Sequence, residues 1–382
     1  MKILHYMPVY APAWQFGGPV RSVSVLCEGL VRLGCEVEVV TTNAGLDGCG
    51  EFVPGEKTVR NGVKVTYFPT VPGYGISSPR AVADVREKLS GADILHVTGV
   101  WQPTATPVCR AAARAHKPYV ISPRGALSAY SWGAGHFKKL LYYWLAERRN
   151  IREASGVHYT SEMEMCECAH YRLAGLPCVI PNGLDFSQWR RDEAGGRSWR
   201  DRLGLAANTR IAIYSGRVHH KKNLDLLLPA LREVPGWVLV IAGFDEGGET
   251  SRFLARAESA GVSKKILLTG NLDQPALRAA YSGSDAFVLP SHHENFANAA
   301  LEAAACGCPL MLSDQVGLAG ELEGHIGAHV LSLDPALWTR ALREYCTPST
   351  TSHGNVHALE SRFSMEQTAK DMLAFYKRVK FQ

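Results

Sequence analysis

The chain has 382 residues, of which 46% are hydrophobic and 20% charged, and its formal net charge at pH 7 is +5. At roughly 100–200 residues per domain, this length predicts two domains, each able to bury a sizeable core. The charge is too small to favour a nucleic-acid partner, and no run of roughly 18 apolar residues predicts a membrane span.

Two features bear on the cellular compartment. The chain begins directly with the strand-like segment KILHYMPVY, without a cleavable leader, so we expect a cytoplasmic protein. Its ten cysteines are scattered and form no C-x-x-C pair, so we interpret them as reduced, mostly buried side chains.

Short runs rich in valine and isoleucine alternate with helical segments in the first half of the chain. We expect strands at 2–8, 36–43, 63–68, 92–99, 118–125 and 156–161 and helices at 20–33, 103–115 and 136–153. The stretch 36–68 is interpreted as a hairpin or a strand pair. This alternation is typical of a parallel sheet covered by helices on both faces.

The same rhythm restarts after a polar stretch at 190–202. Strands are expected at 211–217, 238–244, 265–271, 285–291 and 309–314, again with helices between them. In the tail, Ser364 stands three residues before Gln367, which is the spacing of a helix capping box. The sequence therefore predicts two α/β domains in tandem, with ligands bound at the carboxyl ends of the strands, in a cleft between the domains.

The segment SHHENFANAALEAAACGCP (291–309) carries the clearest chemical signal. Glu294 and Glu302 stand eight positions apart where a strand gives way to a helix, and along a helix this spacing spans about 12 Å. The two carboxylates could hold opposite ends of an elongated ligand such as a sugar nucleotide, whose pyrophosphate would lie near the helix N-terminus. Solvated acids on an ordinary surface helix are the alternative, which the apolar setting of Glu302 disfavours.

A second segment, SGRVHHKKNLDLLLPAL (215–231), delivers Arg217 and Lys222 to the loop after a strand. Two cations at this position can neutralise a pyrophosphate, arginine as a fork and lysine as a point charge. A solvated basic loop is the alternative for this cluster taken alone.

Three weaker signals lie in the first half of the chain. Gly17 and Gly18 lie between the first strand and the first helix, where glycine lets backbone approach a ligand. This turn lacks the G-x-G-x-x-G pattern, so a nicotinamide cofactor is not supported. His96 and Arg124 follow two further strands as sugar or acceptor contacts, although a histidine in such a place is often purely structural.

The helix expected at 136–153 is basic and amphipathic. Its apolar residues are Phe137, Leu140, Leu141, Trp144 and Leu145, and its cations are Lys138, Lys139, Arg148, Arg149 and Arg152. Such a helix can lie on an anionic membrane, but it can also be a core helix with one wet side.

Taken together, these segments resemble glycosyltransferase family 4, retaining enzymes with two Rossmann-like domains in the GT-B arrangement. The resemblance covers nearly the whole chain: GGP after the first strand, PNG at 181–183, GR before Lys222, IAG at 241–243, TGN at 269–271 and the Glu-x7-Glu motif. It implies an acceptor-binding domain at 1–180, a nucleotide-sugar-binding domain at 181–362 and a C-terminal helix at 363–382 that packs back on the first domain.

The resemblance also implies roles for individual residues. Arg217 and Lys222 would bind the donor diphosphate, Glu302 the ribose and Glu294 the transferred sugar. The remaining donor contacts would come from Gly17, Gly18, Gly270, Asn271, Leu272, Asn295, Phe296 and Ala297. In this chain Asn223 replaces a common glycine, and Arg124 stands where many members carry a histidine, which points to a subgroup that builds bacterial surface polysaccharides.

The expected reaction transfers a hexose-type sugar from a UDP-sugar or GDP-sugar to a saccharide or lipid-linked acceptor, with retention of configuration. No cofactor is expected, and because the sequence has no D-x-D pair, a donor-bridging Mg²⁺ is not implied. A sugar-nucleotide hydrolase or epimerase and a non-catalytic sugar-nucleotide-binding protein are the alternatives. Peripheral contact with an anionic membrane, at the inner face of the cell membrane, is a further expectation.

Overall fold

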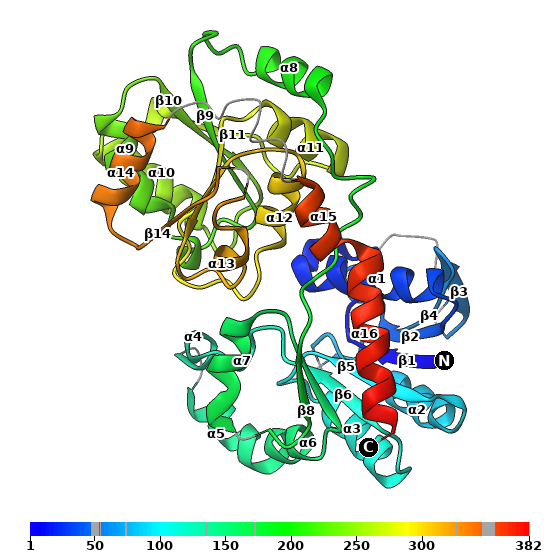
Figure 1. Cartoon of the computed structure of the whole chain (residues 1–382). Helices are drawn as coiled ribbons and strands as arrows, with labels where there is room; N and C mark the ends of the chain where they lie inside the picture. The colour runs from blue at the N-terminus through cyan, green and yellow to red at the C-terminus, as the bar shows by residue number, and fades with distance from the viewer. Residues whose placement is uncertain are drawn as a thin grey trace. The chain divides into compact units, whose positions relative to one another are not determined.

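The computed structural model describes residues 1–46, 53, 55–72, 75–133, 136–171, 173–325, 327–345 and 356–381, and no side chain is described at 132–133 or 136–138. The chain divides into two compact units (Figure 1). Unit 1 comprises Met1–Gly183 and Phe363–Gln382, and unit 2 comprises Leu184–Arg362.

Unit 1 is built on an eight-stranded sheet in the order β3-β4-β2-β1-β5-β6-β7-β8. The strands are β1 Lys2–Tyr6, β2 Glu36–Thr42, β3 Lys57–Arg60, β4 Val63–Phe68, β5 Ile94–Thr98, β6 Tyr119–Ser122, β7 Gly156–Tyr159 and β8 Leu176–Val179. Every neighbouring pair is parallel except β3 and β4.

The stretch 36–68 differs from the hairpin that its pattern suggested. Strands β2 and β4 are parallel neighbours, with Val39 opposite Val65. The antiparallel partner of β4 is instead the short strand β3, in which Thr58 lies opposite Val65. The expected pair of strands is therefore present, but the hairpin is formed by β3 and β4.

Helices cover both faces of this sheet. They are α1 Gly18–Arg32, α2 Pro79–Lys88, α3 Ala105–Arg114, α4 Ala129–Gly133, α5 His136–Tyr142, α6 Arg148–Arg152, α7 Glu162–Cys168 and α16 Met365–Lys380. Shorter turns are η1 Trp14–Phe16, η2 Leu89–Gly91, the π-helical turn η3 Tyr143–Glu147 and η4 Ala169–Tyr171.

The C-terminal helix α16 packs against α1 (Figure 1). Gly29 allows the close approach, because a Cβ there would lie 2.9 Å from the Cβ of Ala369. The expected cap is confirmed, since the amide of Gln367 donates to the hydroxyl of Ser364 at 3.3 Å. Buried side chains of α16 such as Met372 and Phe375 complete the core over the sheet of unit 1.

Unit 2 is built on a six-stranded sheet in the order β11-β10-β9-β12-β13-β14, and all its pairs are parallel. The strands are β9 Arg210–Ser215, β10 Trp237–Ala242, β11 Ile266–Leu268, β12 Ala286–Leu289, β13 Leu310–Ser313 and β14 His329–Leu331. Numbered within the unit, this order is the 3-2-1-4-5-6 order of a Rossmann fold. The predicted α/β class is thereby confirmed.

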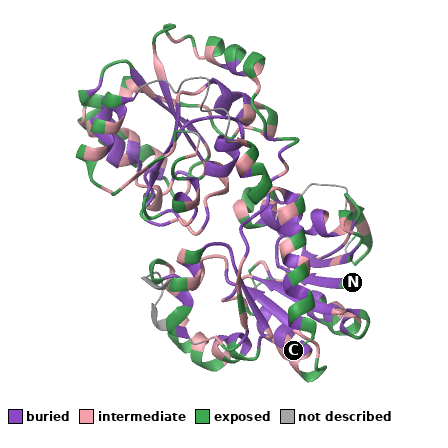
Figure 2. Cartoon of the chain, viewed as in Figure 1, coloured by how far each residue is buried: buried purple, intermediate pink, exposed green. Residues whose placement is uncertain are grey.

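Most helices of unit 2 connect these strands, while the first precedes them and the last two follow them. The helices are α8 Glu193–Arg202, α9 Leu228–Glu233, α10 Glu249–Ser259, α11 Gln274–Gly283, α12 Asn298–Ala305, α13 Ala319–Leu322, α14 Pro335–Glu344 and α15 Val356–Phe363, the last ending at the first residue of the second segment of unit 1. Shorter turns are η5 His220–Lys222, η6 Leu224–Leu227 and η7 Ser263–Lys265. The central strands of both sheets are buried (Figure 2), as expected for parallel sheets covered on both faces.

Candidate active site

The carboxyl edge of the unit 2 sheet gathers most of the predicted site. Because all six strands are parallel, the loops that follow β9, β10, β11 and β12 leave the same edge. Strand β9 pairs with β10 on one side and β12 on the other, so the strand order reverses between β9 and β12. Sheets of this kind bind ligands at such a switch point.

Lys222 and Glu294 form an ion pair at this switch point. Lys222 ends the turn η5 after β9, and Glu294 lies in the loop after β12. The backbones of the two loops are joined, since the amide of His292 donates to the carbonyl of Lys221 at 2.9 Å. The Nζ of Lys222 donates to Oε1 of Glu294, and the two side chains are only 17% and 16% exposed.

The carboxylate of Glu294 is fixed and ionised. Its backbone amide donates to the carbonyl of Gln315 at 2.9 Å, and its carbonyl accepts from Gly317 at 2.8 Å. Burial by itself would raise the pKa of Glu294, but the charges of Lys222 and Lys221 outweigh it and hold the pKa below the ordinary value. The site thus pairs a fixed negative charge with a cation that a phosphate could share.

Arg217 lies at the same edge but is more exposed, at 53% of its side chain. Its Nη1 donates to both carboxylate oxygens of Glu246, at 2.9 and 3.1 Å. The loops after β9 and β10 touch, because a Cβ at Gly243 would lie 1.8 Å from the carbonyl oxygen of Gly216. The sequence did not predict a role for Glu246. The feature that could have indicated one is its position four residues after the end of strand β10.

The two glutamates do not share a helix, which corrects the expected spacing of about 12 Å. Ala297 adopts a left-handed conformation at φ 76°, and α12 starts only at Asn298. Glu294 therefore belongs to the loop, where it forms a bridge with Val316, and Glu302 belongs to the helix. The distance between the two carboxylates therefore cannot be calculated from the rise per residue of a helix.

Glu302 is 7% exposed and faces the interior of unit 2. Tyr281, opposite it, has a pKa well above the ordinary value, first because of burial and then because of the negative charge of Glu302. The hydroxyl of Tyr281 bonds to Ser215, the last residue of β9, at 2.5 Å. Between the glutamates, Phe296 is buried, and Asn295 and Ala297 are half-buried.

The segment 270–272 follows β11, toward the outer side of the sheet. Gly270 and Asn271 are exposed and Leu272 is half-buried. Gly270 has a left-handed φ of 70°, and no atom lies within 4 Å of a Cβ built on it. Open backbone of this kind is accessible to a flat ligand.

In unit 1, the turn after β1 has the expected open backbone. Gly17 has a left-handed φ of 83°, and no atom lies within 4 Å of a Cβ built on it. Helix α1 begins at Gly18 and has a proline in its first turn. This helix start lies at the carboxyl edge of the sheet, where a helix N-terminus favours an anion.

His96 lies in the core of unit 1 and has no exposed surface. Its Nδ1 lies 2.6 Å from the hydroxyl of Tyr376, and its Nε2 lies 2.6 Å from the hydroxyl of Ser122. Its ring stacks on His5 with centroids 4.4 Å apart. A sugar or acceptor contact, as the sequence suggested, would require the interior to open, because packing on strands β1 and β6 encloses the ring.

Arg124 follows β6 in a left-handed turn with φ 56°. Its Nη1 donates to the side-chain oxygen of Asn182, and its Nε is buried and has no hydrogen-bond partner among the described residues. Burial lowers the pKa of Arg124 to about 10. The next amide, of Gly125, donates to Glu164 at 2.6 Å. Arg124 is thus held at the carboxyl edge of unit 1, and its role stays a prediction.

The described part of the chain contains neither a cluster of metal ligands nor a helix that could span a membrane. There, no group of three or more histidine, cysteine, aspartate or glutamate residues could hold a metal ion. None of its helices has both the length and the hydropathy to cross a bilayer.

Two models of protein families match the chain. Residues 17–183 match the model described as glycosyl transferase 4-like domain, and residues 197–345 match the model described as glycosyl transferases group 1. The two models together cover most of the chain, so the chain belongs to the glycosyltransferases that they describe. A D-inositol 3-phosphate glycosyltransferase of Segniliparus rotundus is 31% identical over 212 residues, which are 52% of this chain and 46% of that protein.

Solved structures share the fold of this chain. Sucrose-phosphate synthase from Thermosynechococcus elongatus has a TM-score of 0.76 at 18% identity and covers 99% of this chain and 98% of its own. Anabaena HepE, in complex with UDP and glucose, has a TM-score of 0.77 at 19% identity and covers 99% and 100%. These likenesses establish the GT-B fold. Among the first curated relatives, the chain spans about half of their length, at 46%, 50% and 54%.

Proposed function

We propose that this glycosyltransferase moves a hexose-type sugar from a nucleoside diphosphate sugar to an acceptor hydroxyl, with retention of the anomeric configuration. The observation that carries the proposal is the shielded ion pair between Lys222 and Glu294 at the switch point of unit 2. A cation and a fixed carboxylate side by side match the two halves of such a donor, an anionic diphosphate and a neutral polyol.

The reaction breaks the bond between the sugar C1 and the diphosphate oxygen. A new bond forms from the acceptor oxygen to C1 on the same face, and the acceptor proton passes to the departing diphosphate. Arg217 and Lys222 would stabilise the charge that develops on the leaving oxygens. In binding the diphosphate, Arg217 would exchange its contacts with Glu246 for contacts with phosphate.

The other predicted contacts complete the donor site in this proposal. Glu302 would accept from the ribose hydroxyls, Glu294 from the transferred sugar, and the open backbone at 270–272 would receive the base. The nucleotide is proposed to be uridine diphosphate, because Anabaena HepE was solved with UDP and with UDP-glucose. No cofactor or metal is assigned to the reaction.

The acceptor is proposed to be a saccharide or a lipid-linked saccharide, used in polysaccharide or glycolipid biosynthesis at the cytoplasmic face of the cell membrane. The support is the helical segment α5-η3-α6, which exposes several large apolar side chains, although Ile151 of the same segment is in the core. Leu141, Trp144 and Leu145 are 63%, 59% and 69% exposed. Arg148 lies 4.6 Å from the ring of Trp144. The side chains of Phe137 and Lys138, from the same expected helix, lie outside the described residues.

A donor-consumption assay over UDP- and GDP-hexoses, with and without saccharide acceptors, tests this function. We expect consumption that depends on the acceptor, and a product linkage with the donor's anomeric configuration by NMR. Sugar release or isomerisation without an acceptor would instead indicate a hydrolase or an epimerase. Nucleotide binding without consumption of any donor would indicate a non-catalytic protein.

A further inference from the structure

A cavity of about 730 Å³ opens on unit 1 at the edge opposite its predicted ligand residues. Its walls include Pro118 and Tyr119, Ser155, and Gly175, which lie where strands β6, β7 and β8 begin. Gly17, Gly18 and Arg124 follow the carboxyl ends of their strands, so they lie at the other edge. The cavity is therefore separate from the groups proposed to handle the donor and the acceptor.

The lining of this cavity is strongly basic. Its cationic or titratable basic residues are Arg110, Arg114, His116, Lys117, Arg149 and Lys380. One acidic residue, Glu153, lines it as well. With histidine neutral, five positive charges thus face one negative charge across a shared space.

Helix ends explain part of this charge. Helices α3, α6 and α16 all finish here, and basic residues in a last helical turn interact favourably with the helix dipole. Some of the cations also have partners: Lys380 pairs with Asp93 at 2.7 Å, and Arg149 pairs with Glu153 at 2.7 Å. Lys117 donates to the carbonyl of Ala92 at 2.9 Å.

The charges of two further arginines, both on α3, are not neutralised by these pairings. Within the described ranges, the side chains of Arg110 and Arg114 have no ion-pair or hydrogen-bond partner. Arg110 is half-buried and its Nε is enclosed, whereas Arg114 is exposed. Buried donors without partners are rare and destabilising, because their lost hydration is not replaced. The buried Nε of Arg110 therefore carries such a cost, which an anion in the cavity would offset, and the exposed Arg114 adds a second positive charge to the same space.

We infer that this cavity is a binding site for a phosphate-bearing ligand, separate from the donor site. Guanidinium groups match the geometry of phosphate oxygens through paired N–H donors, which suits Arg110 and Arg114 to this ligand class. The volume exceeds that of a single phosphate, so the cavity has room for a diphosphate or a phosphate ester. This inference goes beyond the proposed function and does not depend on it.

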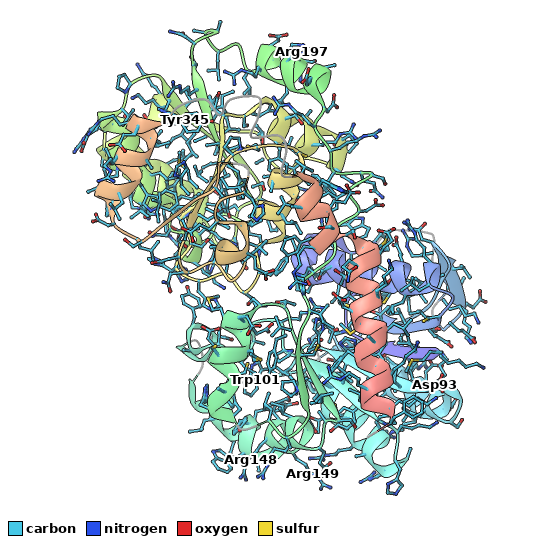
Figure 3. The ribbon with its side chains drawn as sticks, viewed as in Figure 1. Asp93, Trp101, Arg148, Arg149, Arg197 and Tyr345 are labelled. Atoms are coloured by element: carbon cyan, nitrogen blue, oxygen red, sulfur yellow. The ribbon has the colours of Figure 1, made fainter. Side chains whose placement is uncertain are left out.

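Two sources could supply the phosphate. Arg149 lies one helical turn after the exposed Leu145, and it extends from α6 at the outer side of unit 1 (Figure 3). A phospholipid headgroup could therefore enter the cavity while lipid chains contact the apolar residues of η3. A soluble phosphorylated metabolite is the other source, and it would regulate the enzyme from a distance.

The test compares Arg110→Gln/Arg114→Gln with a control of equal charge change, Arg80→Gln/Arg86→Gln. The control pair lies exposed on α2 of the same unit. Inorganic pyrophosphate binding is measured by calorimetry in an Arg217→Gln/Lys222→Gln background, which removes the proposed donor site. Sedimentation with phosphatidylcholine–phosphatidylglycerol vesicles is measured in parallel, and thermal melting checks that each variant is folded.

We expect at least a tenfold weaker affinity in the cavity variant than in the control. A loss confined to pyrophosphate supports a soluble ligand, and a loss confined to vesicles supports a lipid headgroup. If the cavity variant and the control bind both probes equally, the inference is overturned. Donor consumption by the Arg110→Gln/Arg114→Gln enzyme is scored separately, so failure of the proposed function stays distinguishable.

Discussion

The Nδ1 of His96 lies 2.6 Å from the hydroxyl of Tyr376, which joins strand β5 to the C-terminal helix across 280 residues of sequence. The other ring nitrogen bonds to Ser122, and Ser122 in turn bonds to His158 at 2.8 Å. Burial, followed by the positive potential of neighbouring groups, holds the pKa of His96 well below the ordinary value. A neutral histidine network therefore ties helix α16 to the sheet of unit 1.

The first prediction concerns this tie. Tyr376→Phe leaves Nδ1 of His96 buried without a partner, so we expect the free energy of unfolding to fall by about 1–3 kcal/mol. Urea denaturation measures the change, with Tyr130→Phe, in a more exposed side chain, as the control. Nucleotide affinity should be unchanged, because α16 belongs to unit 1. Equal stability of Tyr376→Phe and the wild type would contradict a structural role for the contact.

The second prediction concerns the two cations of unit 2. Lys222→Gln and Arg217→Gln should each lower turnover at least a hundredfold, because each removes a charge-assisted contact of roughly 2–4 kcal/mol to the leaving diphosphate. Steady-state kinetics with the active donor gives the measurement. Arg197→Gln, an exposed arginine on α8 (Figure 3), is the control and should retain full activity. Normal turnover in both test variants would remove the diphosphate assignment.

The third prediction separates the roles of the two glutamates. Because Glu294 lies in a loop and Glu302 in helix α12, each can address a different part of the donor. Glu302→Gln should weaken binding of the free nucleoside diphosphate. Glu294→Gln should leave that affinity nearly unchanged while kcat collapses, since its contact matters mainly in the transition state. Calorimetry measures the nucleotide affinity of both variants, and steady-state kinetics measures their kcat. Equal losses of nucleotide affinity in both variants would refute separate roles for the two glutamates.

The fourth prediction concerns the pH dependence of stability and Glu147. This residue belongs to the segment α5-η3-α6 but is only 1% exposed. Burial raises the pKa of Glu147 to about 7 from the ordinary 4.5. The folded state then binds more protons than the unfolded state between these values, so the free energy of unfolding falls by roughly 3 kcal/mol as pH rises through this range.

Glu147→Gln keeps the shape of the side chain and removes this dependence. Relative to the wild type, the variant should become more stable as the pH is raised from 5 to 8 (urea denaturation, ~2–3 kcal/mol). Glu36→Gln should show no such trend between pH 5 and 8, because the contact with Lys64 holds the pKa of Glu36 below the ordinary value. A stability difference between Glu147→Gln and the wild type that is constant with pH would exclude the burial effect.

The fifth prediction concerns membrane contact. Leu141→Ser/Leu145→Ser removes apolar side chains that are 63% and 69% exposed, and it should weaken sedimentation with anionic vesicles several-fold without destabilising the fold. Val59→Ser is a matched control, because Val59 is also 69% exposed but lies on β3. Undiminished vesicle binding by the leucine variant would exclude this surface as the membrane contact.

The sequence alone determined the alternation of strands and helices, the two α/β domains and the loops that carry Lys222, Arg217 and Glu294. These features follow from local patterns: apolar runs that form strands, glycines that open turns, and polar residues placed after strands. Since parallel strands end at one edge, a local pattern also predicts which loops gather there.

Only the tertiary structure decided which residues meet. Ala297 adopts a left-handed conformation, so helix α12 begins only after Glu294. Arg217 pairs with Glu246, and His96 is enclosed partly by Tyr376 from the far end of the chain. It also decided that Leu141 and Leu145 face outward and that the ends of three helices surround one basic cavity. The reason is physical: a periodic pattern specifies that a face is apolar or charged, but strand pairing and helix packing over long sequence separations decide what covers it.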